Sequence, residues 1–166
     1  MRRPSKRGLA AIGLVGGAAA VTAAVVAQRS TSPAVRVEPA ARADDPACAR
    51  IADHYPDRIA GHERDDTSTP GVAVWGDGTV VLRCGLEPPA RTTDPCFGVN
   101  GVDWVFRESR SAEQGRKILI TYGRNPAVEA FVSDRITEID SVLVSLSDVV
   151  KPIERKDGKC ILPNGR

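Results

Sequence analysis

The sequence predicts an α+β domain with a mostly antiparallel sheet of about five strands and two helices packed on it, preceded by one N-terminal transmembrane or signal helix. Three observations support this prediction. A long uncharged apolar stretch follows a basic N-terminus, several short apolar runs have the two-residue period of strands, and two segments have helical spacing. The 166 residues leave room for one folded domain of ordinary size.

The N-terminal segment predicts insertion into a membrane. Residues 8–27 carry no charge, and a helix of 20 residues spans about 30 Å, the thickness of a bilayer's hydrocarbon core. The tail before it, residues 1–7, holds four basic side chains, so the positive-inside rule places it in the cytoplasm and the rest of the chain outside. We therefore expect a single-pass protein of the cell membrane. The alternative is a signal peptide cleaved near Ala27, which gives a secreted protein.

The segment after the span predicts a flexible linker. Residues 28–44 contain two prolines and few bulky apolar side chains. Such a segment buries too little surface to offset the entropy lost on ordering. The extracytoplasmic α+β domain is then expected over residues 45–163.

The domain is expected to begin with a short helix. Asp45 is a favourable N-cap, and Pro46 is favourable at the first helical position. Pro56 should end this helix, because proline lacks the backbone donor that a helix needs. One helical face would carry Cys48, Ile51, Ala52 and Tyr55.

Short apolar runs in the middle of the chain predict the strands. Gly76-Asp77-Gly78 separates the first two runs, as the turn of a hairpin does. Residues 62–66 are expected to form a polar loop and residues 108–116 a polar turn. The expected strands are residues 72–75, 79–84, 101–107, 117–122 and 127–132.

A second helix is predicted over residues 134–151, where apolar side chains recur at helical spacing and Pro152 follows. Packed on the sheet, the two helices complete the α+β architecture.

The four cysteines, Cys48, Cys84, Cys96 and Cys160, all follow the apolar span. An even number of cysteines outside the cytoplasm is typical of disulfides, and the spacing leaves the three possible pairings open. The competing interpretation makes Cys84 a nucleophile with His54 or His62 as its base. No cysteine or histidine cluster has the spacing of a zinc site, so no metal is predicted.

The charge distribution argues against a nucleic-acid partner. Outside the basic tail, 19 basic side chains face 21 acidic ones, and no basic stripe is present. The sequence also lacks phosphate-binding loops and the usual hydrolase motifs, so no cofactor is expected.

Six residues are candidates for ligand binding: Trp75, Asp77, Asp103, Trp104, Tyr122 and Arg124. A tryptophan at a groove marks a binding surface, a strand carboxylate can act as a base, and an arginine fork can hold an anion. Each also has an ordinary structural interpretation, namely core packing, a hairpin turn or an ion pair. An open pocket that Asp103 and Arg124 share with Tyr122 or a tryptophan would favour catalysis or ligand binding, whereas an ion pair between them on a convex surface would argue against both.

Several blocks resemble domain-of-unknown-function family 3515, whose members are small actinobacterial envelope proteins. The blocks occur at residues 45–48, 74–77, 81–85, 100–104 and 121–129. The resemblance covers about residues 45–150 and implies an exported, membrane-tethered domain. It also implies that Cys48 pairs with Cys84 and Cys96 with Cys160. The family supplies no catalytic residues.

Two classes of function remain. The first is a non-catalytic cell-envelope module that binds an envelope protein or a cell-wall component. The alternative is a small envelope hydrolase or transferase that uses Asp103 and Arg124.

Overall fold

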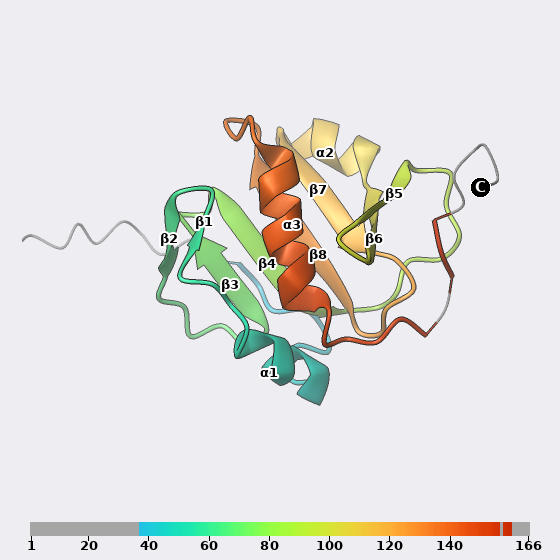
Figure 1. Ribbon diagram of the computed structural model, residues 1–166, viewed down its shortest axis with the longest axis horizontal. Helices are drawn as coiled ribbons and strands as arrows, with labels where there is room; N and C mark the ends of the chain where they lie inside the picture. Colours follow the sequence, from blue (N-terminus) through green and yellow to red (C-terminus); the bar gives the residue numbers. More distant parts are fainter. Residues whose placement is uncertain (1–36, 157, 161–166) are drawn as a thin grey trace, which may run out of the picture. The chain divides into compact units, whose positions relative to one another are not determined.

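The computed structural model describes residues 37–156 and 158–160, which form an α+β domain with one antiparallel sheet of eight strands (Figure 1). The strand order is β1-β2-β3-β4-β8-β7-β6-β5, so the central pair joins the two halves of the chain. The strands are β1 (Arg58–Ile59), β2 (His62–Asp65), β3 (Val72–Trp75), β4 (Val80–Leu86), β5 (Cys96–Val99), β6 (Val102–Phe106), β7 (Arg116–Thr121) and β8 (Ala127–Ser133). The helices are α1 (Pro46–Ala52), α2 (Glu108–Gln114) and α3 (Ile139–Val150).

The α+β class and the antiparallel sheet are confirmed, but the expected counts of about five strands and two helices are wrong. The expected polar loop at residues 62–66 is mostly β2, which pairs with β1 on one side and with β3 on the other through its backbone. The expected polar turn at residues 108–116 contains α2, which buries only Ser111 and therefore has no apolar stripe to reveal it. Strand β5 (Cys96–Val99) lies between the expected strands at residues 79–84 and 101–107, where no strand was predicted.

Helix α1 begins as expected. Asp45 accepts a hydrogen bond from the backbone N–H of Ala47 at 2.9 Å, which satisfies one of the free donors of the first turn. The Arg42 guanidinium donates to the other Asp45 oxygen at 2.8 Å. Both contacts favour the ionised carboxylate, so they lower the pKa of Asp45 from its ordinary value.

Helix α3 crosses one face of the sheet and covers the larger core (Figure 1). Successive strand residues point to opposite faces, so Leu82 and Ala130 contact this core while Val81 and Phe131 point away from it. Val37, at the start of the described chain, packs on the opposite face against the buried cluster of Val72, Val74 and Val81. The central strands β4 and β8 are therefore covered on both faces, which explains their apolar composition.

The hairpin predicted at Gly76-Asp77-Gly78 is confirmed as the turn between β3 and β4, with Trp75 opposite Val80. All three turn residues have positive φ, and the turn approaches β2 closely. A Cβ at Gly76 would lie 2.5 Å from His62 Nδ1, so this position has room only for glycine.

Both disulfides have the pairing that the resemblance implies. Cys48–Cys84 joins α1 to β4 in the core, and Cys96–Cys160 joins β5 to the C-terminal segment. All four sulfurs are used in these bridges, which removes Cys84 as a candidate nucleophile.

The described residues contain no helix long and apolar enough to cross a bilayer. The expected span at residues 8–27 and the expected basic tail lie outside the described residues. The expected linker, residues 28–44, is described only from Val37 onward. There Arg42 donates its backbone N–H to Gly85 at 3.0 Å, beside a bulge in β4.

Candidate functional site

The two tryptophans lie in the core rather than on a binding surface. Trp75 on β3 and Trp104 on β6 are both fully buried. The Trp75 indole N–H donates to the carbonyl of Pro56 at 2.9 Å, and that of Trp104 donates to Ser147 Oγ on α3 at 3.0 Å. The indole N–H groups of the two tryptophans therefore hold the loop after α1 and helix α3 against the sheet.

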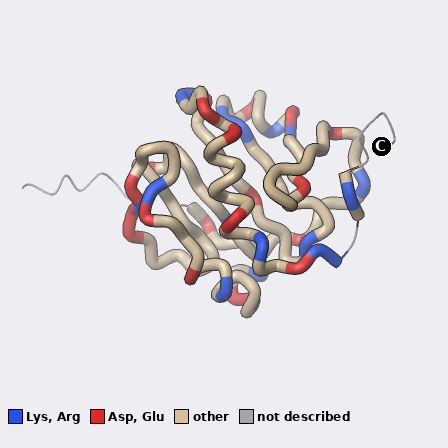
Figure 2. The backbone as a smooth tube through the Cα atoms, in the orientation of Figure 1, with Lys and Arg blue, Asp and Glu red and all other residues tan. Residues whose placement is uncertain are grey.

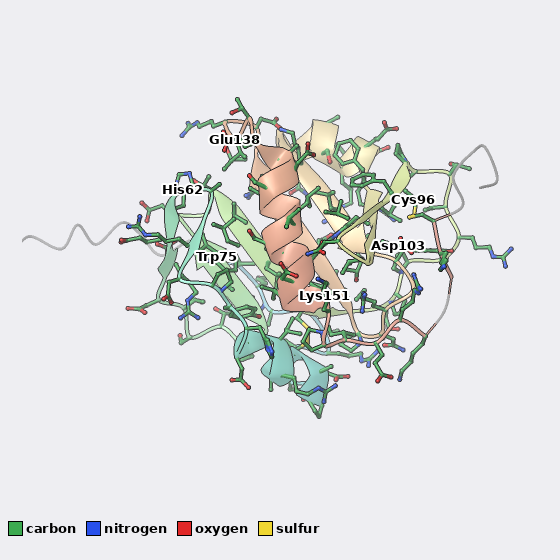
Figure 3. All side chains as sticks on the ribbon, in the orientation of Figure 1. His62, Trp75, Cys96, Asp103, Glu138 and Lys151 are labelled. Carbon is green, nitrogen blue, oxygen red and sulfur yellow. A yellow bond between two sulfur atoms is a disulfide. The ribbon has the colours of Figure 1, made fainter. Side chains whose placement is uncertain are left out.

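Asp77 and Asp103 lie at different places in the domain. Asp77 is exposed on the β3–β4 turn, where its backbone N–H donates to Asp65 Oδ2 at 2.8 Å. Asp103, labelled in Figure 3, lies on β6 opposite Gly98 of the neighbouring strand β5. Its Oδ2 lies 3.4 Å from both Arg155 Nη1 and the backbone N of Cys160. Asp103 therefore holds the C-terminal segment.

The structure brings two of the predicted residues together, because Tyr122 and Arg124 line the same cavity at the turn after β7. This cavity, which we call the Tyr122–Arg124 cavity, has a volume of about 160 Å³. The remaining lining comes from Pro88, Pro89, Gly123, Asn125 and Gly158. Asp103 is not among the lining residues, so the shared pocket of Asp103 and Arg124 that would favour the catalytic alternative is not found here.

The C-terminal segment closes one side of the Tyr122–Arg124 cavity. Arg155 forms a β-bridge with Arg124, and the backbone N–H of Lys156 donates to Gly123 at 2.8 Å. Gly158 then passes so close to Tyr122 that a Cβ would lie 2.7 Å from Tyr122 Cε1. The Cys96–Cys160 disulfide anchors this segment two residues later.

Arg124 is a buried cation with carbonyl partners. Only 6% of the residue is exposed, and its guanidinium donates to the carbonyls of Ile153 and, at 3.1 Å, Gly101. Its Nε is buried without a hydrogen-bond partner. Burial lowers the pKa of Arg124, and nearby Arg155 lowers it further while Asp103 opposes this shift. Arginine still keeps its charge at neutral pH, so the cavity has a cationic wall.

The other wall of the cavity combines apolar and amide groups. Pro88, Pro89 and a half-buried Tyr122 supply its apolar surface, and the cis Asn125–Pro126 peptide bond lies at the same turn. The Asn125 side-chain oxygen accepts from Arg42 Nη1 at 2.7 Å, which fixes the amide. The segment before α1 thereby supports the same cavity.

The lining offers binding groups but no acid–base pair. Among the described residues that line the Tyr122–Arg124 cavity, only Tyr122 and Arg124 have titratable side chains. Arginine donates hydrogen bonds and retains its proton, and no carboxylate or histidine accompanies it there. In the described part of the chain, no group of three or more His, Cys, Asp or Glu could hold a metal ion.

A second charged cluster was missed in the sequence. Glu129 on β8 is fully buried, and its two oxygens accept from Arg110 Nη1 and, at 2.6 Å, from Arg83 Nη2. The guanidiniums of Arg83 and Arg116 also lie over the Phe131 ring, at 5.7 Å and 5.3 Å from its centre. One signal was available: Glu129 is the single charged residue in an otherwise uncharged strand.

Charges of both signs are distributed over the described domain (Figure 2). Most basic side chains have an acidic partner nearby, such as Arg42 with Asp45 and Lys117 with Asp134. Arg124 is an exception, because it forms no direct ion pair with an acidic side chain of the described residues. Such an unpaired cation is a candidate for binding an anionic or acceptor group of a ligand.

Comparisons with known proteins agree with the resemblance. No curated protein and no solved structure matches the chain. Residues 9–157 match the family described as "Protein of unknown function (DUF3515)". The matched range includes most of the expected N-terminal span at residues 8–27. Since this match covers far more than half of the sequence, the chain belongs to the DUF3515 family.

Proposed function

We propose that this protein is a non-catalytic module of the cell envelope, anchored by a single N-terminal span, that binds an envelope protein or a cell-wall component in the Tyr122–Arg124 cavity. The observation that carries the proposal is Arg124, a buried cation in the cavity wall whose Nε has no partner. A buried charge without a direct ion-pair partner costs free energy. An acceptor oxygen of a ligand would recover part of that cost.

The size of the cavity indicates what enters it. A volume of about 160 Å³ holds a small group of a larger partner, such as one side chain or a chain terminus. Pro88, Pro89 and the Tyr122 ring offer apolar contact, while Arg124 offers donors. We therefore expect the bound group to carry an oxygen acceptor beside an apolar part.

The catalytic alternative has less support. Asp103, the proposed base, contacts Arg155 and the Cys160 backbone instead of the cavity. Arg124 donates to two backbone carbonyls, a role that fixes the C-terminal segment. A reaction would need a proton acceptor at the cavity, and none is found among the described lining residues.

Two features support the proposed location outside the cytoplasm. The domain contains two disulfides, which persist in oxidising compartments. The uncharged stretch at residues 8–27 follows a basic tail, as in proteins that export their C-terminal part. Protease treatment of intact spheroplasts should digest the domain, whereas protection of the domain would contradict this location.

Photocrosslinking in intact cells tests the binding role. A photoreactive residue at Pro88, in the cavity wall, should capture one defined partner, whereas the same residue at exposed Val144 on α3 should not. The Gly158→Ala variant should abolish capture, because its Cβ lies 2.7 Å from Tyr122 Cε1 and fills the cavity.

The matched control is Gly61→Ala. Gly61 also has a positive φ, but a Cβ there meets nothing within 4 Å, so the variant carries the backbone strain without filling a cavity. Equal capture from residues 88 and 144, or capture that survives Gly158→Ala, would contradict the proposed binding site.

A further inference from the structure

A second hollow lies where the β3–β4 turn, the start of β7 and the end of β8 meet. Its volume is about 300 Å³, nearly twice that of the Tyr122–Arg124 cavity. We call it the arginine hollow, because Arg116 and Arg135 line it together with Asp77, Thr79, Gln114 and Ser133.

Neither arginine of this hollow has an acidic partner. In the described part of the chain, no carboxylate lies within ion-pair distance of Arg116 or Arg135. Arg116 donates from Nη2 to the Gly78 carbonyl at 2.9 Å, and its Nε is buried without a partner. Burial also lowers the pKa of Arg116, while Asp134 opposes this shift. The hollow thus holds a partly desolvated cation.

The neighbouring cluster fixes Arg116 and adds positive charge. Arg116 and Arg83 both lie over the Phe131 ring, and Arg83 shares the single carboxylate of Glu129 with Arg110. Three arginines therefore accompany one buried carboxylate on this face of the sheet. A guanidinium already held by an aromatic ring loses less entropy when it binds an anion.

The acidic groups nearby leave an excess of positive charge. Asp77 lines the hollow, and Asp134 lies beside it but pairs with Lys117 at 3.0 Å. Two arginines thus face one lining carboxylate, and the Glu129 cluster contributes a further surplus of basic side chains.

The remaining lining supplies neutral donors. The Ser133 hydroxyl accepts from the backbone N–H of Arg135 at 3.3 Å, which leaves its proton for a ligand. The exposed Gln114 amide adds further donors. Two guanidiniums, a hydroxyl and an amide arranged around one hollow suit an oxyanion that accepts from several directions.

We propose that the arginine hollow binds the phosphate group of a phosphate ester through Arg116 and Arg135. The hollow is larger than a single phosphate, so it also leaves room for the esterified group. This site is separate from the Tyr122–Arg124 cavity, and the proposal does not depend on the function proposed above.

Titration of the full chain in maltoside micelles with glycerol 3-phosphate tests the proposal. We expect saturable binding that weakens as salt screens the charges, and no comparable binding of acetate. Arg135→Gln should weaken binding about tenfold, as expected when one charge-assisted contact is lost. Arg135 is exposed, so this variant should fold normally.

The matched control is Arg91→Gln, an exposed arginine outside the hollow, which should bind with unchanged affinity. Arg116→Lys keeps the charge but loses the guanidinium fork, so it should also weaken binding; circular dichroism checks its fold. Absence of saturable binding, equal losses in Arg135→Gln and Arg91→Gln, or equal affinity for acetate would overturn the proposal.

The source of the phosphate group is then resolved with nanodiscs. If the phosphate belongs to a lipid headgroup, phosphatidylglycerol in the nanodisc should compete with glycerol 3-phosphate, and phosphatidylcholine should compete less. If it belongs to a soluble ester, neither lipid should compete. Both outcomes support a phosphate site, provided that Arg135→Gln removes the binding.

Discussion

Replacing Glu129 with glutamine tests whether the buried charge cluster stabilises the domain. Glu129 is fully buried, and each of its oxygens accepts from a different arginine. Glutamine keeps the shape but loses the charge and turns one acceptor into a donor that faces a guanidinium. Arg83 and Arg110 would then remain partly buried without a counter-charge.

The size of the effect follows from burial. Breaking a buried ion pair costs about 3–5 kcal/mol. The side chains of Arg83 and Arg110 are 22% and 37% exposed, so water screens part of their charge. We therefore expect Glu129→Gln to lower the free energy of unfolding by about 3 kcal/mol, at the lower end of that range. Arg110→Gln should lower the free energy of unfolding by less, about 1 kcal/mol, because Glu129 still forms its ion pair with Arg83.

Urea unfolding of the oxidised protein, followed by tryptophan fluorescence, measures these changes, since both tryptophans are buried. Glu63→Gln is the matched control: Glu63 also pairs with an arginine, Arg58, but its side chain is 74% exposed. We expect the control to cost less than about 1 kcal/mol. A similar loss in Glu129→Gln and Glu63→Gln would refute the argument from burial.

Three further predictions concern the disulfides, a tyrosine and a helix cap. Replacing Cys96 and Cys160 by alanine opens a loop of sequence separation 64 and should cost about 4.3 kcal/mol in thermal or urea unfolding. Burial raises the pKa of Tyr55 to about 12, so this tyrosine ionises at a lower pH in the unfolded chain than in the folded protein. The free energy of unfolding should therefore fall as the pH rises from about 10 towards 12. Tyr55→Phe should remove this loss in urea unfolding, while ultraviolet absorbance follows the ionisation of tyrosine. The pKa of Asp45 is lowered, so its contribution to stability is present above the ordinary value and disappears as the pH falls through the lowered pKa; Asp45→Asn keeps a cap acceptor and should flatten this acid dependence in unfolding measurements.

Each of these three expectations has a result that contradicts it. Unchanged stability without the Cys96–Cys160 bridge would show that the unfolded chain is not constrained by it. The same loss of stability above pH 10 in Tyr55→Phe as in the parent would show that Tyr55 is not the group that causes it. The same acid slope in Asp45→Asn as in the parent would assign the slope to other carboxylates.

The sequence predicted the elements whose burial leaves a periodic pattern. Strands β3, β4, β6, β7 and β8 each place apolar side chains against the core, and their positions agree with expectation to within two residues. Helix α3 is also present, but it begins at Ile139, five residues later than the expected start at residue 134. Helix α1 is shorter than expected and ends at Ala52. Tyr55 therefore lies after the helix, where its ring packs edge-on against Trp75.

Elements stabilised by their backbone rather than by burial were missed. Strand β2 consists of four polar residues, and its pairing with β3 is visible only in three dimensions. In α2, a left-handed Gly115 ends the helix, and the buried Ser111 hydroxyl accepts from the Ile118 N–H at 3.0 Å. Neither contact has a periodic signature in the sequence.

The candidate site was predicted only in part. Tyr122 and Arg124 line one cavity because they flank the same turn, but Asp103 contacts the C-terminal segment instead. The path of that segment is set by the β-bridge between Arg155 and Arg124 and by the Cys96–Cys160 disulfide. Both contacts join residues far apart in the sequence, so no local sequence pattern indicates them. The Glu129 cluster joins β4, α2 and β8, so only the tertiary structure brings it together.

The strand order has a consequence for how the chain matures. A nascent chain emerges N-terminus first, so one edge of β4 stays unpaired until β8 has been made. Facing residues of the two strands, such as Arg83 and Glu129, are 46 positions apart in the sequence. The sulfur bridge within the first half, Cys48–Cys84, can close during this interval, since both of its residues have already emerged. Cys160 is the last of the four cysteines to emerge, so its disulfide with Cys96 can form only after all eight strands have been synthesised.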